Sequence, residues 1–245
     1  MKTVLITGAN KSIGFETARQ LLQKGYYVYL GSRDAEKGQQ AVDQLKSEGF
    51  DSVESITIDV DNLESIKAAR AALGQKVEVL DVLINNAGIS GGFPQTALGT
   101  DIYVFKQVFE TNVFGVVSTT QAFIDLLKAS PEPRIVNVTS GLGSLTLHSD
   151  PNWKYYHVKG ACYPASKAAL NAYTIVLAYE LRDTPFKVNA VDPGYTATDF
   201  NQHRGPGTVS DAAARLVKAA TLESDGPTGQ FFSDDNAPDT GISPW

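Results

Sequence analysis

The sequence predicts a single α/β domain over residues 1–245, in which helices cover both faces of a doubly wound parallel sheet. Three observations lead to this fold class. Short apolar runs alternate with amphipathic helical stretches, an order that is typical of parallel sheets. Apolar residues make up 42% of the chain, which is enough for a substantial core. No repeat, low-complexity tract or linker divides the chain, so one domain is the simplest interpretation.

The first element in order is a strand–turn–helix–strand unit. An apolar run from Thr3 ends at Gly8, a helix begins near Ser12, and a second strand starts at Tyr26. Gly8 permits a sharp turn, and Gly14 lets the helix pack close to the sheet. The helix N-terminus then offers free N–H groups to a pyrophosphate, as in Rossmann-type dinucleotide-binding folds. The alternative is the first turn of any parallel sheet, because T-G-x-x-x-S-I-G is wider than the six-residue Rossmann pattern.

The remaining elements follow in the same alternation. We expect further strands at Val53–Ile58, Val79–Ile84, Arg134–Thr139, Phe186–Val191 and Gly229–Phe232. We expect helices at Ala35–Glu48, Asn62–Leu73 with Asn62 as its cap, Ile102–Ala129, Ala161–Arg182 and Ser210–Leu222. The long third helix in this series should break or bend near Asn112–Gly115. Residues 145–160 have no clear period.

Composition excludes several classes of protein. The net charge of −6 and the lack of a basic block argue against nucleic-acid binding. The single cysteine, Cys162, rules out an intramolecular disulfide and suits a reducing compartment. No apolar run is long enough for a membrane span or a signal peptide, so we expect a soluble, cytoplasmic protein. The three histidines lack metal-ligand spacing, and no metal is predicted.

Tyr163 and Lys167 are four residues apart at the start of a helix, which places them on one face. An ammonium about 4 Å from a phenol oxygen, at an effective dielectric near 20, attracts the phenolate by about 4 kcal/mol. This would lower the phenol pKa by roughly three units, towards neutrality, where proton exchange with a carbonyl oxygen is possible. The alternative is a solvated pair on a helix surface, but the pair opens the helix that follows the fifth strand.

Together these motifs resemble the short-chain dehydrogenase/reductase family, and the resemblance runs nearly end to end. The matching pieces occur in the family's order at the ends of the expected elements. They are Thr7-Gly8-x-x-x-Ser12-Ile13-Gly14, Asp59-Val60, Asn85-Asn86-Ala87-Gly88, Asn112, Ser140, Tyr163-x-x-x-Lys167 and Pro193-Gly194.

The resemblance implies a catalytic role for four residues. Tyr163 would be the general acid for carbonyl reduction and the base in reverse. Lys167 would lower the pKa of Tyr163 and hydrogen-bond the nicotinamide ribose, and Ser140 would hold the substrate oxygen. Asn112 would tie a water to Lys167; the alternative is a polar residue that bends its helix.

The resemblance also implies a cofactor-binding set. Asp59 would contact the adenine, Asn86 and Gly88 would line the cofactor, and the turn after the sixth strand would bracket the nicotinamide carboxamide. The set comprises Gly8, Asn10, Lys11, Ser12, Ile13, Gly14, Arg33, Asp59, Val60, Asn86, Ala87, Gly88, Tyr163, Lys167, Pro193, Gly194, Thr196 and Thr198.

Charge at the end of the second strand favours NADP(H) over NAD(H). NAD enzymes usually place a carboxylate there for the ribose 2′-hydroxyl, whereas this chain has Ser32 followed by Arg33, with Lys11 in the glycine turn. Two cations suit a 2′-phosphate. Asp34 could pair with Arg33, but we expect it to cap the next helix.

Two features depart from the family pattern. Ser12 stands where glycine is common, which is tolerated if the backbone there is helical.

The second departure is the spacing of Ser140 and Tyr163. They are 23 positions apart, which is longer than usual, and the extra residues include the aromatic segment Trp153–His157. This lengthening and the C-terminal residues 242–245 resemble the carbonyl-reductase branch. Ser144 and Ser149 are alternatives to Ser140, which we prefer because it directly follows a strand.

Apolar residues on loops at the carboxyl ends of strands are candidates for a substrate pocket. They are Phe93, Leu145, Trp153, Tyr195 and Phe200. Cys162, beside the catalytic tyrosine, is expected to pack in the interior, with pocket lining as the alternative.

We therefore expect an NADPH-dependent oxidoreductase that reduces a ketone or aldehyde, with Tyr163 as proton donor. The alternatives are a dehydrogenase that oxidises a specific alcohol, of steroid or sugar type, and a non-catalytic NADP-binding sensor. The state of association, monomer or homo-oligomer, stays open: the helices over 102–129 and 161–182 resemble those that pair subunits in the family, but the lengthened segment could block them.

Overall fold

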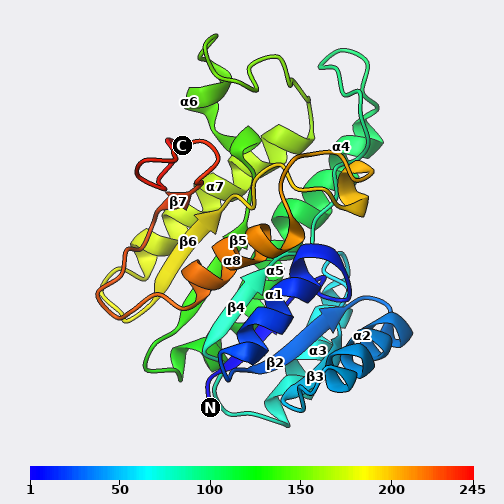
Figure 1. Cartoon of the computed structure of the whole chain (residues 1–245), viewed down its shortest axis with the longest axis vertical. Coiled ribbons are helices and arrows are strands. Elements are labelled where there is room, and N and C mark those ends of the chain that lie inside the picture. Colours follow the sequence, from blue (N-terminus) through cyan, green and yellow to red (C-terminus); the bar gives the residue numbers. More distant parts are fainter.

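A seven-stranded parallel sheet forms the centre of the computed structural model, which describes residues 1–245 (Figure 1). The strand order is β3-β2-β1-β4-β5-β6-β7. The strands are β1 (Thr3–Ile6), β2 (Tyr27–Ser32), β3 (Val53–Thr57), β4 (Val82–Asn85), β5 (Arg134–Val138), β6 (Lys187–Val191) and β7 (Phe231–Phe232). The order reverses between β1 and β4, and ligands of doubly wound sheets bind at such a point. The predicted Rossmann-type fold class is confirmed.

Helices cover both faces of the sheet. On one face lie α1 (Ser12–Gln23), α2 (Ala35–Ser47) and α8 (Val209–Ala220); on the other lie α3 (Leu63–Gly74), α5 (Gly115–Lys128) and α7 (Tyr163–Glu180). The remaining helices are α4 (Ile102–Phe109) and α6 (Leu145–His148). No helix has the length and apolar character that crossing a membrane requires.

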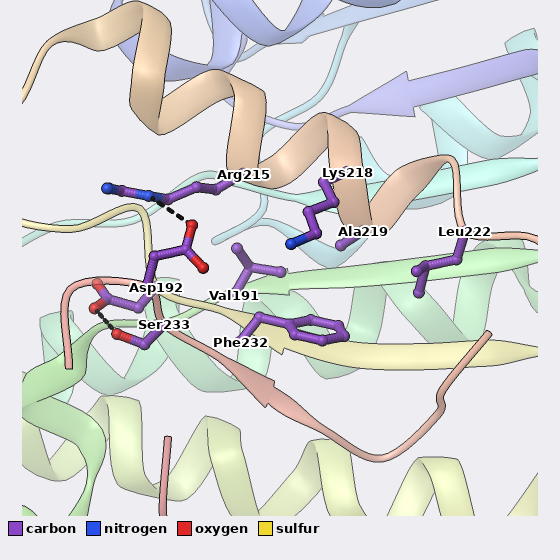
Figure 2. Close-up of a pocket in the computed structure, with 9 residues that line it drawn as sticks. Val191, Asp192, Arg215, Lys218, Ala219, Leu222, Phe232 and Ser233 are labelled. Atoms are coloured by element: carbon purple, nitrogen blue, oxygen red, sulfur yellow. Dashed lines mark hydrogen bonds and ion pairs between the residues drawn. The ribbon is translucent and has the colours of Figure 1, made fainter. Parts of the chain in front are cut away.

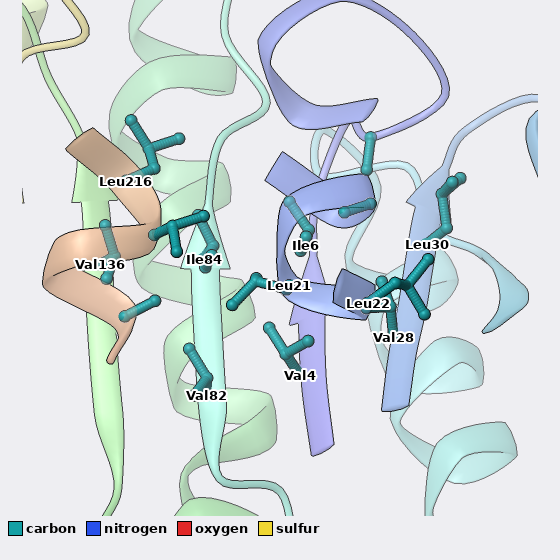
Figure 3. Close-up of a cluster of buried hydrophobic side chains, with 14 of the residues drawn as sticks. Val4, Ile6, Leu21, Leu22, Val28, Leu30, Val82, Ile84, Val136 and Leu216 are labelled. Atoms are coloured by element: carbon teal, nitrogen blue, oxygen red, sulfur yellow. The ribbon is translucent and has the colours of Figure 1, made fainter. Parts of the chain in front are cut away.

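Two buried clusters hold the layers together, one on each face of the sheet. Successive side chains of β1 contribute to both clusters, because Val4 and Ile6 point to one face of the sheet and Leu5 points to the other. Figure 3 shows Leu21 and Leu22 of α1 lying over β1 and its neighbours. The carboxyl ends of the strands therefore meet at one fixed edge, below the loops that lead into α4, α6 and α8 (Figure 1).

The predicted caps and breaks agree with the structure. Asn62 caps α3, since its side-chain oxygen accepts the N–H groups of Glu64 and Ser65. The predicted long helix is interrupted by a π-helical turn, η1 (Glu110–Phe114), with Asn112 at its centre. π-helical turns are frequent at functional sites.

Some predicted boundaries are wrong. The fourth strand begins at Val82 rather than Val79; just before it, the Asp81 side chain accepts Thr3 N–H at 2.7 Å and the Val79 carbonyl accepts the Thr3 hydroxyl. The helix expected from Ala161 begins at Tyr163. The short helix α6 lies in the segment for which no period was found.

Candidate active site

The start of α7 is fixed by a side chain from a distant loop. The Gln95 side-chain oxygen accepts the backbone N–H groups of Cys162 and Tyr163 at 3.2 and 3.0 Å. These are groups that a helix start leaves unpaired. The Gln95 amide in turn donates to the carbonyls of Ser90 and Gly92. Gln95 is buried and ties the loop after β4 to the first turn of α7; sequence reasoning missed it, because no local pattern marks a contact across 67 residues.

Tyr163 and Lys167 lie together in the interior at this helix start. Lys167 Nζ is 5.8 Å from the centroid of the Tyr163 ring and donates to the Val138 carbonyl at 2.8 Å. Burial lowers the pKa of Lys167 to about 8. Burial also raises the pKa of Tyr163, with Ser140 acting to lower it and the Asp192 charge acting to raise it.

The predicted fall of the Tyr163 pKa towards neutrality is wrong for this structure, because burial raises that pKa. The calculation placed the ammonium about 4 Å from the phenol oxygen. In the structure the Lys167 ammonium donates to the Val138 carbonyl at the end of β5, and burial is the main influence on the pKa of the Tyr163 phenol. At neutral pH, Tyr163 is therefore protonated.

Ser140 is the serine that the structure brings to Tyr163. It directly follows β5, its hydroxyl accepts Leu142 N–H at 3.2 Å, and it interacts with the Tyr163 phenol. Ser144 instead caps α6, where its hydroxyl accepts the Leu147 N–H, and Ser149 donates to the Leu145 carbonyl. Geometry therefore favours Ser140 over both alternatives.

Asn112 is fully buried and held by protein groups. Its amide oxygen accepts Ile89 N–H at 2.9 Å, and its nitrogen donates to the Ile89 carbonyl and to Ser166 Oγ. A side chain at Gly88 would meet Asn112 Oδ1 at 3.3 Å and Lys167 Nζ at 3.6 Å. Asn112 therefore lies in the π-helical turn and also near Lys167, with Gly88 between them. Both sequence interpretations, a residue that bends its helix and a residue that holds a water on Lys167, remain open.

The glycine turn after β1 forms a cradle that side chains would fill. Gly8 has a left-handed φ of +62°, and a Cβ there would lie 3.0 Å from Ala87 Cα. A Cβ on Gly14 would lie 2.5 Å from Asn86 Nδ2, which itself donates to the carbonyls of Thr7 and Gly8. A pyrophosphate binds to free backbone N–H groups at the N-terminal end of a helix, where no side chain blocks its approach. The glycine turn and the start of α1 therefore fit a dinucleotide.

Ser12 is the first residue of α1 but does not meet the condition of a helical backbone under which a serine is tolerated there. Its φ is +51°, in the left-handed region, which a residue with a Cβ adopts at a cost. The serine thus stands in the conformation that favours glycine, and the sequence expectation is corrected. Asn10, Lys11 and Ile13 flank it in the same turn.

The two cations predicted to favour NADP(H) differ in their partners. Arg33 is exposed and forms no ion pair, while Asp34 caps α2 and approaches Lys37, as expected. Lys11 is paired, because its ammonium lies 3.0 Å from Asp199. Asp59 and Val60 follow β3, where Asp59 accepts the N–H of Asp61.

The turn after β6 carries the other expected cofactor contacts. Gly194 has a φ of +79°, and its N–H is held by the Asp192 carboxylate at 2.9 Å. The Thr196 hydroxyl donates to the carbonyls of Pro193 and Gly194. Thr198 is buried and caps a short turn at Asp199–Asn201.

Of the apolar residues predicted to line a substrate pocket, Phe200 packs against Tyr163. The Phe200 ring centroid lies 5.5 Å from that of Tyr163, and Phe200 is 46% exposed. Phe93, Leu145 and Tyr195 are also exposed. Trp153 differs from them: it is buried, and its indole donates to Asn236 at 3.1 Å. Trp153 therefore packs in the interior of the lengthened segment and does not contribute to an exposed pocket surface.

Cys162 is fully buried immediately before Tyr163. Burial raises the pKa of its thiol, so the thiolate is disfavoured. This agrees with a packing role.

Comparison with known proteins gives consistent results. The family model described as short chain dehydrogenase matches residues 2–208. Short-chain dehydrogenase anuI of Penicillium roqueforti is 40% identical over 223 residues, covering 89% of this chain and 88% of that protein. The (+)-neomenthol dehydrogenase of Capsicum annuum is 35% identical over 297 aligned positions, covering 93% and 94% of the two chains.

Solved structures show the same similarity. Salutaridine reductase from Papaver somniferum has a TM-score of 0.83 at 30% identity, covering 96% of this chain and 100% of that chain. The NADPH-bound carbonyl reductase from chicken fatty liver has a TM-score of 0.85 at 26% identity, covering 100% and 99%.

Proposed function

Because the chain belongs to the short-chain dehydrogenase/reductase family and is an oxidoreductase, we propose that it transfers hydride from NADPH to a ketone or aldehyde. The observation that carries the proposal is the convergence of Ser140, Tyr163 and Lys167 at the buried start of α7. The glycine cradle between β1 and β4 opens at the same edge of the sheet.

Residues of the protein would supply the proton that the reduced carbonyl oxygen takes up. The nicotinamide, when bound, supplies the hydride. Tyr163 keeps its proton at neutral pH and would donate it to the oxygen that gains charge as the carbonyl is reduced. Ser140 would hold that oxygen by a hydrogen bond. Lys167, whose pKa is about 8, is mostly charged at pH 7 and would favour the phenolate that remains.

The preference for NADPH rests on Arg33 and Lys11. The guanidinium of Arg33 has no protein carboxylate to neutralise it and is free to bind a 2′-phosphate in bidentate fashion. The solved carbonyl reductase similar to this chain is described as NADPH bound, which supports the same choice. We place the reaction in the cytoplasm, as the single cysteine suggests.

The Phe200 ring beside Tyr163 favours an apolar carbonyl compound. The exposed apolar side chains of Phe93, Leu145 and Tyr195 are the further candidates for substrate contact. Relatives named salutaridine reductase and (−)-isopiperitenone reductase support reduction as the direction of the reaction. A relative named as a neomenthol dehydrogenase keeps oxidation of such an alcohol as the second candidate.

A cofactor and substrate panel tests the proposal. Purified protein is given NADPH or NADH with alicyclic ketones, aldehydes and quinones, and oxidation of the reduced cofactor is followed. We expect turnover with NADPH on bulky apolar ketones. A preference for NADH would overturn the role of Arg33 and Lys11, and tight NADPH binding without any turnover would favour a non-catalytic sensor.

A further inference from the structure

Asp199 lies in the segment between β6 and α8 and reaches the glycine turn, a contact that the proposed function does not use. Its Oδ2 accepts the Lys11 ammonium at 3.0 Å, and its Oδ1 lies 2.9 Å from Nε2 of His203. The hydrogen bond from Lys11, with His203 acting in the same direction, lowers the pKa of Asp199. The carboxylate is therefore ionised at neutral pH.

The turn that presents Asp199 is built at a conformational cost. The Asn201 side-chain oxygen accepts the Thr198 N–H at 3.2 Å and closes the turn. Gln202 and His203, which follow, have φ values of +58° and +57°, in the left-handed region that residues with a Cβ adopt at a cost. From this conformation His203 contacts one oxygen of Asp199 and leaves the other for Lys11. The turn thus fixes the direction in which the carboxylate points.

The same turn also contacts the helix that carries the catalytic tyrosine. Phe200, the next residue after Asp199, packs against Tyr163 with 5.5 Å between the ring centroids. Two adjacent side chains therefore contact the two parts of the proposed site, one at the glycine turn and one at the start of α7. The pair of Asp199 and Lys11 belongs to the cofactor site and not to a remote surface.

The helix that follows this turn, α8, offers Asp199 no ion pair. Figure 2 shows Arg215 extending from α8 towards the end of β6. There it donates to the Pro193 carbonyl and pairs with Asp234 at 3.5 Å. Lys11 is therefore the cation on which both Asp199 and a bound 2′-phosphate would converge.

We propose that Asp199 is a residue that determines cofactor specificity: it holds the Lys11 ammonium and so limits how strongly the protein prefers NADPH to NADH. The inference rests on the proposed function, in which Lys11 and Arg33 bind the 2′-phosphate. An ammonium has three donors, enough to contact a phosphate and Asp199 together. The two anions then share one cation and repel each other, so Asp199 offsets part of the attraction that Lys11 supplies. NADH lacks the phosphate and does not meet this repulsion.

Equilibrium binding of NADPH and NADH to the wild type and to Asp199→Asn tests the inference, with cofactor fluorescence as the signal and at low ionic strength. We expect Asp199→Asn to bind NADPH about fivefold more tightly, which is the upper range for one pair of exposed charges. NADH binding should stay nearly unchanged. Asp199→Ser is a second neutral variant and should show the same shift. The shift should shrink in about 1 M salt, where the Debye length is about 3 Å.

Asp225→Asn is the matched control, because it also removes one negative charge. Asp225 is exposed in the loop between α8 and β7, at the edge of the sheet where the strands begin. We expect this variant to leave the ratio of NADPH to NADH affinity unchanged.

Three results would overturn the inference: an unchanged ratio in both neutral variants of Asp199, a loss of NADPH affinity in both, or an equal shift in Asp225→Asn. The proposed function is judged separately, by whether the wild type binds NADPH more tightly than NADH. The shift caused by Asp199→Asn is measured whichever cofactor the wild type prefers. A wild type that binds neither cofactor would overturn both.

Discussion

At the scale of single residues, the active site depends on ionisable groups that the fold removes from water. Tyr163 and Lys167 are both buried, and burial shifts the pKa of each towards its neutral form. The helix spacing predicted that the two residues meet, but not which force controls them. Spacing fixes a helix face, whereas desolvation depends on segments that are distant in the sequence.

Lys167 should make stability depend on pH. Its pKa is about 8 in the folded protein and near 10.5 when unperturbed, so between these values the unfolded state binds more protons. The free energy of unfolding of the wild type should therefore rise relative to Lys167→Met between pH 8 and 10.5, by roughly 3 kcal/mol. Urea denaturation of both proteins at the two pH values measures this, and a constant difference would contradict it.

At the scale of elements, the start of α7 depends on Gln95. Gln95→Ala leaves the N–H groups of Cys162 and Tyr163 without their acceptor. We expect the free energy of unfolding to fall by about 1–3 kcal/mol, the usual cost of unpaired buried groups. Gln95→Glu is the control, because it retains the acceptor oxygen. Chemical denaturation distinguishes the two variants, and equal losses would show that the donor side of Gln95 matters more.

The helix α1 is anchored to the sheet by Leu21. The side chain is fully buried among residues of the first core cluster (Figure 3). Leu21→Ala should lower the free energy of unfolding by about 2–5 kcal/mol, since it leaves a cavity between α1 and the sheet. Gln23→Ala, at the end of the same helix and outside the core cluster, should change stability little. Thermal denaturation of the two variants makes the comparison.

Elements differed in how well the sequence predicted them. The Asn62 cap and the break at Asn112 were predicted because each depends on a local signal: a capping side chain and an interrupted helical pattern. The start of β4 at Val82, the left-handed Ser12 and the Gln95 contact were not predicted, because each depends on neighbours in space. The contact of Asp192 with the Gly194 N–H was also missed, although the place of Asp192 between a strand and Pro193-Gly194 was visible in the sequence.

At the scale of the whole molecule, the two cations on which the choice of cofactor rests come from different parts of the chain. Arg33 lies unpaired after β2, whereas Lys11 is held by Asp199 from the segment that precedes α8. Arg33→Ala should weaken NADPH binding about tenfold and leave NADH binding nearly unchanged, because only NADPH carries the 2′-phosphate. Fluorescence titrations with both cofactors test this. An equal loss for the two cofactors would assign Arg33 a role in folding or in the pyrophosphate site.

The most direct test of the central claim compares the wild type with Tyr163→Phe, at saturating NADPH and with a ketone that the wild type reduces. The substitution removes one hydroxyl from a buried ring, so cofactor affinity should stay close to that of the wild type. The rate of carbonyl reduction should fall by about 10²–10⁴-fold, the usual contribution of a general acid. Retained binding with this loss would support Tyr163 as the proton donor. Undiminished reduction by Tyr163→Phe would contradict the account.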